Sequence, residues 1–171
     1  MTVFSATFAT ASITSAGGIQ DIFELVAPAN SRVVIHDVVL AQFSDELAAE
    51  AEIVSILLMR GHSSSGSGGV DITTTGVANL NPYGRATGCT VERNNSTLAS
   101  GGSPETLWAD GWHLQAGFIW RMSERLNMLG NDGKIVLKPS QRFVVRMNEA
   151  IADDISANGT LLFEEIGKVP A

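Results

Sequence analysis

The sequence contains a single cysteine, Cys89, among its 171 residues. One cysteine excludes a disulfide within the chain and a cluster of thiolates on one metal ion. Basic residues are also scarce: 11 Lys and Arg face 18 Asp and Glu, which gives a formal net charge of −7. Because nucleic-acid affinity comes mostly from Lys and Arg that neutralise phosphates, we expect no direct binding to DNA or RNA.

Long hydrophobic runs are missing as well. The best apolar runs are interrupted by Asp37 and Ser55, and none approaches the roughly 20 residues that a membrane-spanning helix needs. Residues 1–18 have no basic stretch and no continuous apolar core, and they alternate as a strand does. We therefore expect no membrane partner and no export signal.

Aromatic residues make up only 6% of the sequence and charged residues 17%, whereas glycine occurs 17 times. This composition favours a loop-rich β protein over a helical bundle. Two adjoining apolar runs rich in β-branched residues, 32–42 and 51–60, are short enough for strands and are bounded by turn residues. We expect them to be core strands on which the remaining elements pack.

Strand patterns recur along most of the chain, separated by glycine pairs, prolines and Asn-Gly. The further predicted strands are 2–13, 21–26, 71–75, 90–93, 106–114, 117–121, 135–137, 141–147 and 160–165. Residues 158–159 are interpreted as the corner before the last strand, residues 44–50 as a short acidic connection, and 123–129 as a helical turn or a loop. Within 141–147, alternation predicts Phe143, Val145 and Met147 on one face and Arg142, Val144 and Arg146 on the other.

About eight to ten short strands at fairly regular spacing are typical of an antiparallel β-sandwich such as a jelly roll. We therefore predict one all-β domain over residues 1–171, with a loop-rich excursion at 63–102. The stretch 63–69, Ser-Ser-Ser-Gly-Ser-Gly-Gly, is predicted to be flexible from its composition. An excursion this long is usually functional or disordered, so it is where we expect contacts with a partner.

Catalytic chemistry finds little support in the sequence. His36 and Asp37 are a base beside a carboxylate, but neighbours on a strand point to opposite faces and form no direct dyad. His62 precedes a serine-rich tract that lacks the G-x-S-x-G spacing of a nucleophile elbow, and a flexible linker is the better interpretation. The three histidines have no metal-ligand spacing, and the glycine-rich tract has no phosphate-binding context. We expect no enzyme activity, no metal and no cofactor.

Three tryptophans lie close together at Trp108, Trp112 and Trp120. Trp108 and Trp112 have the same strand parity, with Gly111 as a candidate bulge between them, so they are candidates for an exposed platform that binds sugars or a protein. Burial in the core is the favoured alternative, because a domain with so few aromatic residues tends to bury them.

Several short segments together carry a resemblance over most of the chain. They are 23–30 before a Val-rich strand, 60–62 running into 66–69, 92–97 with 99–102, 115–118, 139–142 and 159–165. In this order they resemble a family of small virion proteins of tailed bacteriophages, jelly-roll proteins that decorate or cement the head. The tract 123–133 is longer here than in the family pattern.

The resemblance implies a non-enzymatic decoration protein on the outer surface of a phage head, with the major capsid protein as its partner. It implies a homotrimer seated where shell subunits meet, which is located on the virion and assembled in the bacterial cytoplasm. The candidate partner-contact residues are Ser65, Gly66, Ser67, Arg85, Arg93, Asn94 and Asn95. The alternative is a sugar-binding or adhesin-like jelly-roll module of a phage tail or a bacterial surface, with the tryptophans as its platform.

Overall fold

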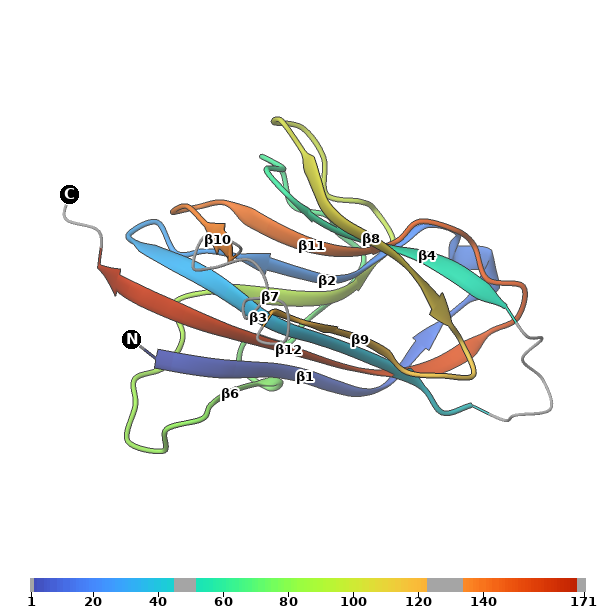
Figure 1. The fold of residues 1–171 in the computed structure, drawn as a ribbon, viewed down its shortest axis with the longest axis horizontal. Helices are drawn as coiled ribbons and strands as arrows, with labels where there is room; N and C mark the ends of the chain where they lie inside the picture. Colours follow the sequence, from blue (N-terminus) through green and yellow to red (C-terminus); the bar gives the residue numbers. More distant parts are fainter. Residues whose placement is uncertain (1, 45–51, 123–133, 169–171) are drawn as a thin grey trace.

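The computed structural model describes residues 2–44, 52–122 and 134–168. The strands of these residues form two six-stranded sheets in which every pairing is antiparallel (Figure 1). The predicted all-β sandwich is therefore confirmed, with twelve strands in place of the expected eight to ten. Most of the predicted acidic connection at 44–50 and the whole predicted turn at 123–129 lie outside the described residues.

The first sheet has the order β10-β3-β12-β1-β6, and β9 also pairs with β3. Its strands are β1 (Thr2–Ile13), β3 (Ser31–Gln42), β6 (Val77–Asn79), β9 (Phe118–Arg121), β10 (Ile135–Leu137) and β12 (Ile155–Lys168). The second sheet has the order β5-β7-β2-β11-β4-β8. Its strands are β2 (Gln20–Val26), β4 (Ile53–Arg60), β5 (Val70–Asp71), β7 (Thr90–Asn95), β8 (Glu105–His113) and β11 (Arg142–Met147). A 3-10 turn, η1 (Ser15–Gly17), links β1 to β2.

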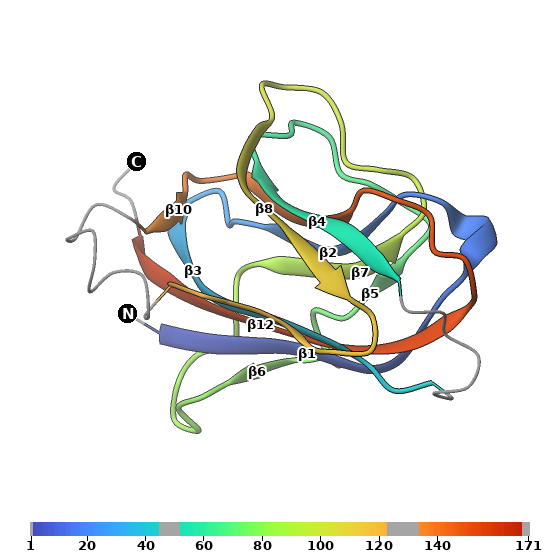
Figure 2. The ribbon, with the colours of Figure 1, turned by 45° about the vertical axis from the view of Figure 1, so that its right-hand side comes forward.

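The strand order is that of a jelly roll. β9 and β10 pair with different halves of β3, so they share one position at the edge of the first sheet. The sandwich then consists of β1-β12-β3-β9/β10 facing β2-β11-β4-β8 (Figure 2). The first four strands alternate between the two sheets, and the last two, β11 and β12, insert between earlier ones. This is the double-sheet arrangement of eight strands that a jelly roll requires.

The core lies between the two sheets and is filled by side chains at alternate strand positions. Phe4 of β1 stacks on Phe163 of β12 at 5.4 Å between ring centroids, and Phe8 packs on Phe23 at 5.0 Å. Gly159 lies beside this second pair, where an added Cβ would be 2.4 Å from Cε1 of Phe8. The interpretation of residues 158–159 as a corner is therefore wrong: they lie within β12, and the glycine makes room for an aromatic ring.

Strand β11 has the predicted alternation, but neither of its faces is open to solvent. Phe143, Val145 and Met147 are fully buried in the core, while Arg142 and Arg146 lie on the outer face. Val144, between the two arginines, is also fully buried. The outer face of this sheet is therefore covered by another part of the chain.

That cover comes from the connection between β4 and β8. These strands pair directly, yet residues 61–104 leave β4, cross the outer face of the second sheet, add β5 and β7 beyond β2, and add β6 beyond β1. The excursion predicted at 63–102 thus contains three strands, β5, β6 and β7, of which β6 has no counterpart in the sequence prediction.

Candidate partner surface

Two arms of the excursion run side by side over the outer face of the second sheet (Figure 2). We call residues 61–69 and 96–104 the loop ribbon. Ser64 and Ser100 exchange backbone hydrogen bonds of 3.0 and 3.1 Å, and Ser67 and Thr97 exchange bonds of 3.0 and 2.9 Å. The prediction of a flexible linker at 63–69 is therefore wrong, because each arm supplies the backbone partners of the other.

The underside of the ribbon is fastened to β2 and β11 by a buried ion pair. Asp21 has no exposed surface, and its carboxylate accepts bonds from Nε and Nη2 of Arg146 at 2.6 and 3.1 Å. The same carboxylate accepts the backbone N–H of Ala99 at 2.7 Å, while Arg146 donates to the carbonyl of Ala99 at 3.0 Å. One residue of the ribbon thus satisfies both members of a buried charge pair, which is the condition under which such a pair is tolerated.

A second buried carboxylate, Glu24 of β2, holds the other arm. It is 1% exposed and accepts the backbone N–H of Gly66 at 2.8 Å and Nδ2 of Asn95 at 3.1 Å. Nε of Arg142 lies 3.5 Å from its other oxygen and donates to the hydroxyl of Ser65 at 2.9 Å. Gly66 is required here, because an added Cβ would lie 2.4 Å from the carbonyl oxygen of Thr97.

His62 lies at the base of the ribbon and is 4% exposed. Burial and the nearby Arg146 guanidinium lower the pKa of His62 below its ordinary value. The imidazole is therefore neutral at pH 7, which suits a buried position near the Arg146 guanidinium.

The upper side of the ribbon is exposed and carries no charge. Ser65 and Ser67 are exposed there, together with neighbouring Ser, Thr and Gly residues at 63–64, 68, 96–97 and 100–103. Short side chains lose little rotamer entropy when they are buried, and the backbone beneath them is already ordered. The ribbon therefore offers a stiff, uncharged polar surface.

Arg93 and Asn94 of β7 lie beside the ribbon, where they line an open pocket with Gly68, Gly69 and Ser96. The Arg93 guanidinium lies over the Phe8 ring at 5.6 Å. Asn94 has a φ of 54° and donates from Nδ2 to the carbonyl of Ser12 at 3.1 Å. Both side chains therefore have a packing role within the chain.

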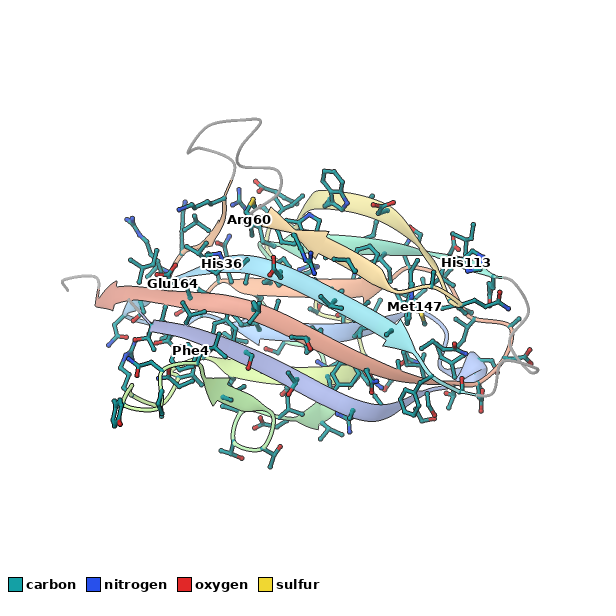
Figure 3. All side chains as sticks on the ribbon, turned by 60° about the horizontal axis from the view of Figure 1, so that its bottom comes forward. Phe4, His36, Arg60, His113, Met147 and Glu164 are labelled. Carbon is teal, nitrogen blue, oxygen red and sulfur yellow. The ribbon has the colours of Figure 1, made fainter. Side chains whose placement is uncertain are left out.

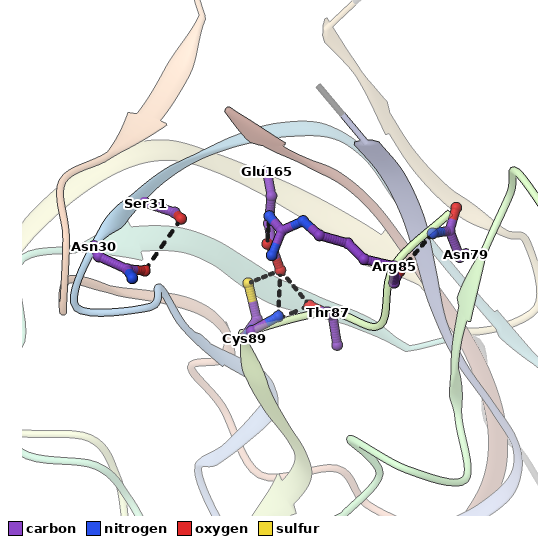
Figure 4. A network of polar contacts seen from close by, with 8 residues as sticks. Asn30, Ser31, Asn79, Arg85, Thr87, Cys89 and Glu165 are labelled. Carbon is purple, nitrogen blue, oxygen red and sulfur yellow. Dashed lines mark hydrogen bonds and ion pairs between the residues drawn. The ribbon is translucent and has the colours of Figure 1, made fainter. Parts of the chain in front are cut away.

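Arg85 lies elsewhere, at the end of the sandwich near the start of β1. It pairs with Glu165 of β12, whose side chain is fully buried (Figure 4). Glu165 also accepts the Thr87 hydroxyl at 2.5 Å and the Gly88 N–H at 2.6 Å. Burial alone would raise the pKa of Glu165, but these hydrogen bonds and Arg85 outweigh it and hold the pKa below its ordinary value.

Cys89 is buried within this same cluster, with Sγ 3.5 Å from a carboxylate oxygen of Glu165. Burial raises the pKa of the Cys89 thiol to about 12. A thiol with so little thiolate at neutral pH is a poor nucleophile and a poor metal ligand.

The structure divides the predicted contact residues into three places. Ser65, Gly66, Ser67 and Asn95 meet at the ribbon, but only the two serines are exposed. Arg93 and Asn94 lie next to the ribbon, and Arg85 lies at one end of the sandwich. The glycine- and serine-rich composition predicted the position of the ribbon, but not the buried charged residues that hold it on the sheet.

The anchoring residues that were not predicted as site residues are Asp21, Glu24, Arg142 and Arg146. A signal for two of them was present, because Arg142 and Arg146 share the face of a strand whose other face is core. Their carboxylate partners lie more than 100 residues away in the sequence and became visible only through the pairing of β2 with β11.

The tryptophans do not form an exposed platform. Trp112 is fully buried and donates from its indole N–H to the Ala116 carbonyl at 2.9 Å, and Trp120 is 3% exposed. Trp108 is partly buried and packs against the core. The irregularity in β8 lies between Thr106 and Trp108, not at Gly111.

His36 forms a contact with a carboxylate other than that of its neighbour. Its Nε2 lies 3.1 Å from Oε2 of Glu164 on the adjacent strand β12 (Figure 3). Asp37 pairs across the sheet with Arg121 of β9 in the strand register, and a β-bulge interrupts the β3–β12 pairing at this point. His36 and Asp37 therefore make no dyad with each other.

Within the described ranges, no group of three or more His, Cys, Asp or Glu side chains is placed to hold a metal ion. Among the same residues, no helix has the length and apolar character needed to cross a membrane.

Comparison with known proteins returns no matching family model and no matching curated protein. Among solved structures, the VP2 subviral particle of infectious bursal disease virus is 14% identical with a TM-score of 0.24, covering 99% of this chain and 42% of VP2. VP17, a capsid protein of bacteriophage P23-77, is 11% identical with a TM-score of 0.12, covering 92% of this chain and 87% of VP17. This chain thus spans less than half of VP2, and similarity at these TM-scores carries no argument about function.

Proposed function

We propose that this chain is a non-enzymatic structural protein of a bacteriophage head, a decoration protein that binds the outer surface of the shell where subunits meet. The sequence resemblance to phage head-decoration proteins suggests this role. The observation in its favour is the loop ribbon, an exposed surface whose backbone is ordered before any partner binds. Preorganisation of this kind lowers the entropic cost of association.

In this role the protein binds the major capsid protein through the exposed serines of the ribbon, and sister copies associate as a trimer. Each copy needs only modest affinity, because several linked contacts to one shell raise the overall avidity. The protein is then located on the virion, after assembly in the cytoplasm of the bacterial host. Burial of Trp112 removes the platform on which the sugar-binding alternative depended.

The test is co-sedimentation of the purified protein with empty heads of the phage that encodes it. These heads are prepared without the protein. Ser67→Arg places a long charged side chain on the exposed side of the ribbon and is expected to weaken binding by at least about tenfold. Ala150→Arg adds the same group at an exposed position in the loop between β11 and β12 and serves as the matched control. Heads that bind no wild-type protein would refute the proposal.

Deletion of 63–69 is not a clean test. It would remove Gly66 and Ser65, which satisfy Glu24 and Arg142, and would therefore damage the fold together with the surface. Point substitutions of exposed serines leave these buried contacts in place.

A further inference from the structure

A second surface lies at the end of the sandwich where β1 begins and β12 ends (Figure 1). Among the described residues, three connections lie there, at 27–30, 80–89 and 138–141, because the strand pairing brings Thr2 opposite Glu165, Val33 opposite Leu137, and Val26 opposite Arg142. The most exposed aromatic side chain of the described residues, Tyr83, is in the second connection, at 96% exposure. Leu80 beside it is 57% exposed.

The turn that carries Tyr83 is rigid. The N–H of Gly84 donates to the carbonyl of Asn81 at 2.9 Å, which closes a β-turn with Pro82 at its second position, where proline is favoured. The side chain of Asn81 accepts the N–H of Tyr83 at 3.1 Å. The backbone of Tyr83 is therefore held in place at the tip of an ordered turn.

The base of the turn is fixed equally well. Asn79 accepts the N–H of Asn81 at 2.8 Å and donates to the carbonyl of Arg85 at 2.6 Å. The N–H of Leu80 donates to the carbonyl of Val3 at 3.0 Å, and Arg85 is paired with the buried Glu165. Tyr83 and Leu80 are thus exposed on a backbone that is already ordered by folding, so little further backbone entropy is lost on binding.

The described connections of this end are basic, although the whole molecule has a net negative charge. Together with the strand residues next to them, as 27–32, 79–89 and 137–142, they contain four cations, Arg32, Arg85, Lys138 and Arg142, and no carboxylate. Arg85 and Arg142 are engaged with Glu165 and Glu24, whereas Arg32 and Lys138 are exposed. These last two line an open pocket of about 430 Å³ together with Arg60, Val136 and Pro139. Arg60 is paired with Glu105 at 3.0 Å, so Arg32 and Lys138 carry the excess positive charge of the pocket.

The connections at the opposite end have the reverse character. Their described residues, 14–19, 43–44, 52, 114–117 and 148–154, contain four carboxylates, Glu52, Glu149, Asp153 and Asp154, and no Lys or Arg. A basic end on a chain of net charge −7 is therefore a local feature, which orients the molecule in the field of a charged partner.

We propose that this basic end is a second docking surface. It binds an acidic surface of a partner protein, and an apolar pocket of that partner receives the Tyr83 ring. Tyr is among the residues that dominate binding energy when a pocket desolvates the ring, and Arg32 and Lys138, at the same end of the sandwich, supply pairing for carboxylates of the partner. The proposal rests on the proposed function in one respect: the partner is taken to be the phage shell.

The experiment measures binding of the chain to empty heads of the encoding phage at several salt concentrations. Tyr83→Ala is expected to weaken binding by at least about tenfold, and Tyr83→Phe to retain most of it. Arg32→Glu combined with Lys138→Glu is expected to weaken binding at low salt and to flatten its salt dependence. Ile53→Ala, a 64% exposed apolar side chain toward the opposite end, is the matched control and is expected to bind as the wild type does.

The outcomes separate the two proposals. Absence of wild-type binding at low salt removes the proposed function and this inference with it. If the wild type binds but Tyr83→Ala or the double charge reversal changes the affinity for heads by less than about twofold, the inference is wrong and the proposed function stands. The inference is also wrong if Tyr83→Ala dissociates an oligomer of the chain itself while head binding persists. The surface would then bind a second copy of the chain.

Discussion

The pair formed by Asp21 and Arg146 tests whether the loop ribbon is a structural layer of the domain. Asp21 is fully buried and the Arg146 side chain is 12% exposed. Among the described residues, Asp21→Leu leaves the guanidinium buried with only the Ala99 carbonyl as hydrogen-bond partner. In the same part of the chain, Arg146→Met leaves the carboxylate buried with only the Ala99 N–H as hydrogen-bond partner. Each single substitution is expected to lower the free energy of unfolding by about 3–5 kcal/mol, the cost of a buried charge without its counterion.

The double substitution removes both charges and is expected to cost far less than the sum of the two. What remains is the unpaired N–H and carbonyl of Ala99, at about 1–3 kcal/mol for such a group. The assay is urea unfolding followed by tryptophan fluorescence, to which the buried Trp112 and Trp120 contribute, analysed as a double-mutant cycle. Asp21→Asn, which keeps the volume and loses the charge, provides a milder single variant where Asp21→Leu fails to fold.

Amide hydrogen exchange adds a local measurement, because the N–H of Ala99 is held by Asp21 and should lose protection in both Asp21 variants. Single substitutions that each cost less than about 1 kcal/mol, and that add in the double variant, would refute the account of the ribbon as a layer fastened by buried charge.

Three further predictions concern pH and packing. Because the pKa of Glu165 is depressed in the fold, its stabilisation is complete above its unfolded pKa of about 4.3 and is lost as the pH falls through the folded value. Glu165→Gln should therefore show a shallower loss of stability in urea titrations below about pH 4.5. Because the pKa of His62 is lowered in the fold, the unfolded chain binds a proton at higher pH, and the free energy of unfolding falls as the pH drops below about 6.5. His62→Gln should reduce this slope of stability against pH. An unchanged slope would exclude His62 as its source. Gly159→Ala should cost about 1–3 kcal/mol in thermal or urea unfolding because its Cβ would displace the Phe8 ring, and a neutral effect would contradict the close packing.

The strands that sequence patterning predicted best are those with one face in the core. The predicted strands at 2–13 and 135–137 coincide with β1 and β10, and the alternation in 141–147 assigned the two faces of β11 as found. Such strands are visible locally, because a period of two in apolar residues follows from the pleat alone.

The errors at 158–159 and 63–69 have a common cause. Glycine, serine and asparagine indicate which backbone conformations a segment can adopt, but not which other segments it contacts. Asn158-Gly159 has the composition of a turn, but Phe8 and Phe23 from other strands occupy the space that a side chain would need. The stretch 63–69 has the composition of a flexible linker, but Asp21, Glu24 and the opposing arm of the ribbon supply its hydrogen bonds. A local pattern contains no information about such partners.

The sequence by itself determined that this protein is an all-β sandwich with one lone cysteine and a long glycine- and serine-rich excursion, since these follow from composition and periodicity. Only the tertiary structure decided that the excursion is an ordered layer and that Trp112 and Trp120 are buried in the core. It also placed Tyr83, Arg32 and Lys138 at the same end of the sandwich. The physical reason is that each of these properties depends on contacts between segments far apart in the chain, which strand pairing, the packing of the two sheets and the buried ion pairs bring together.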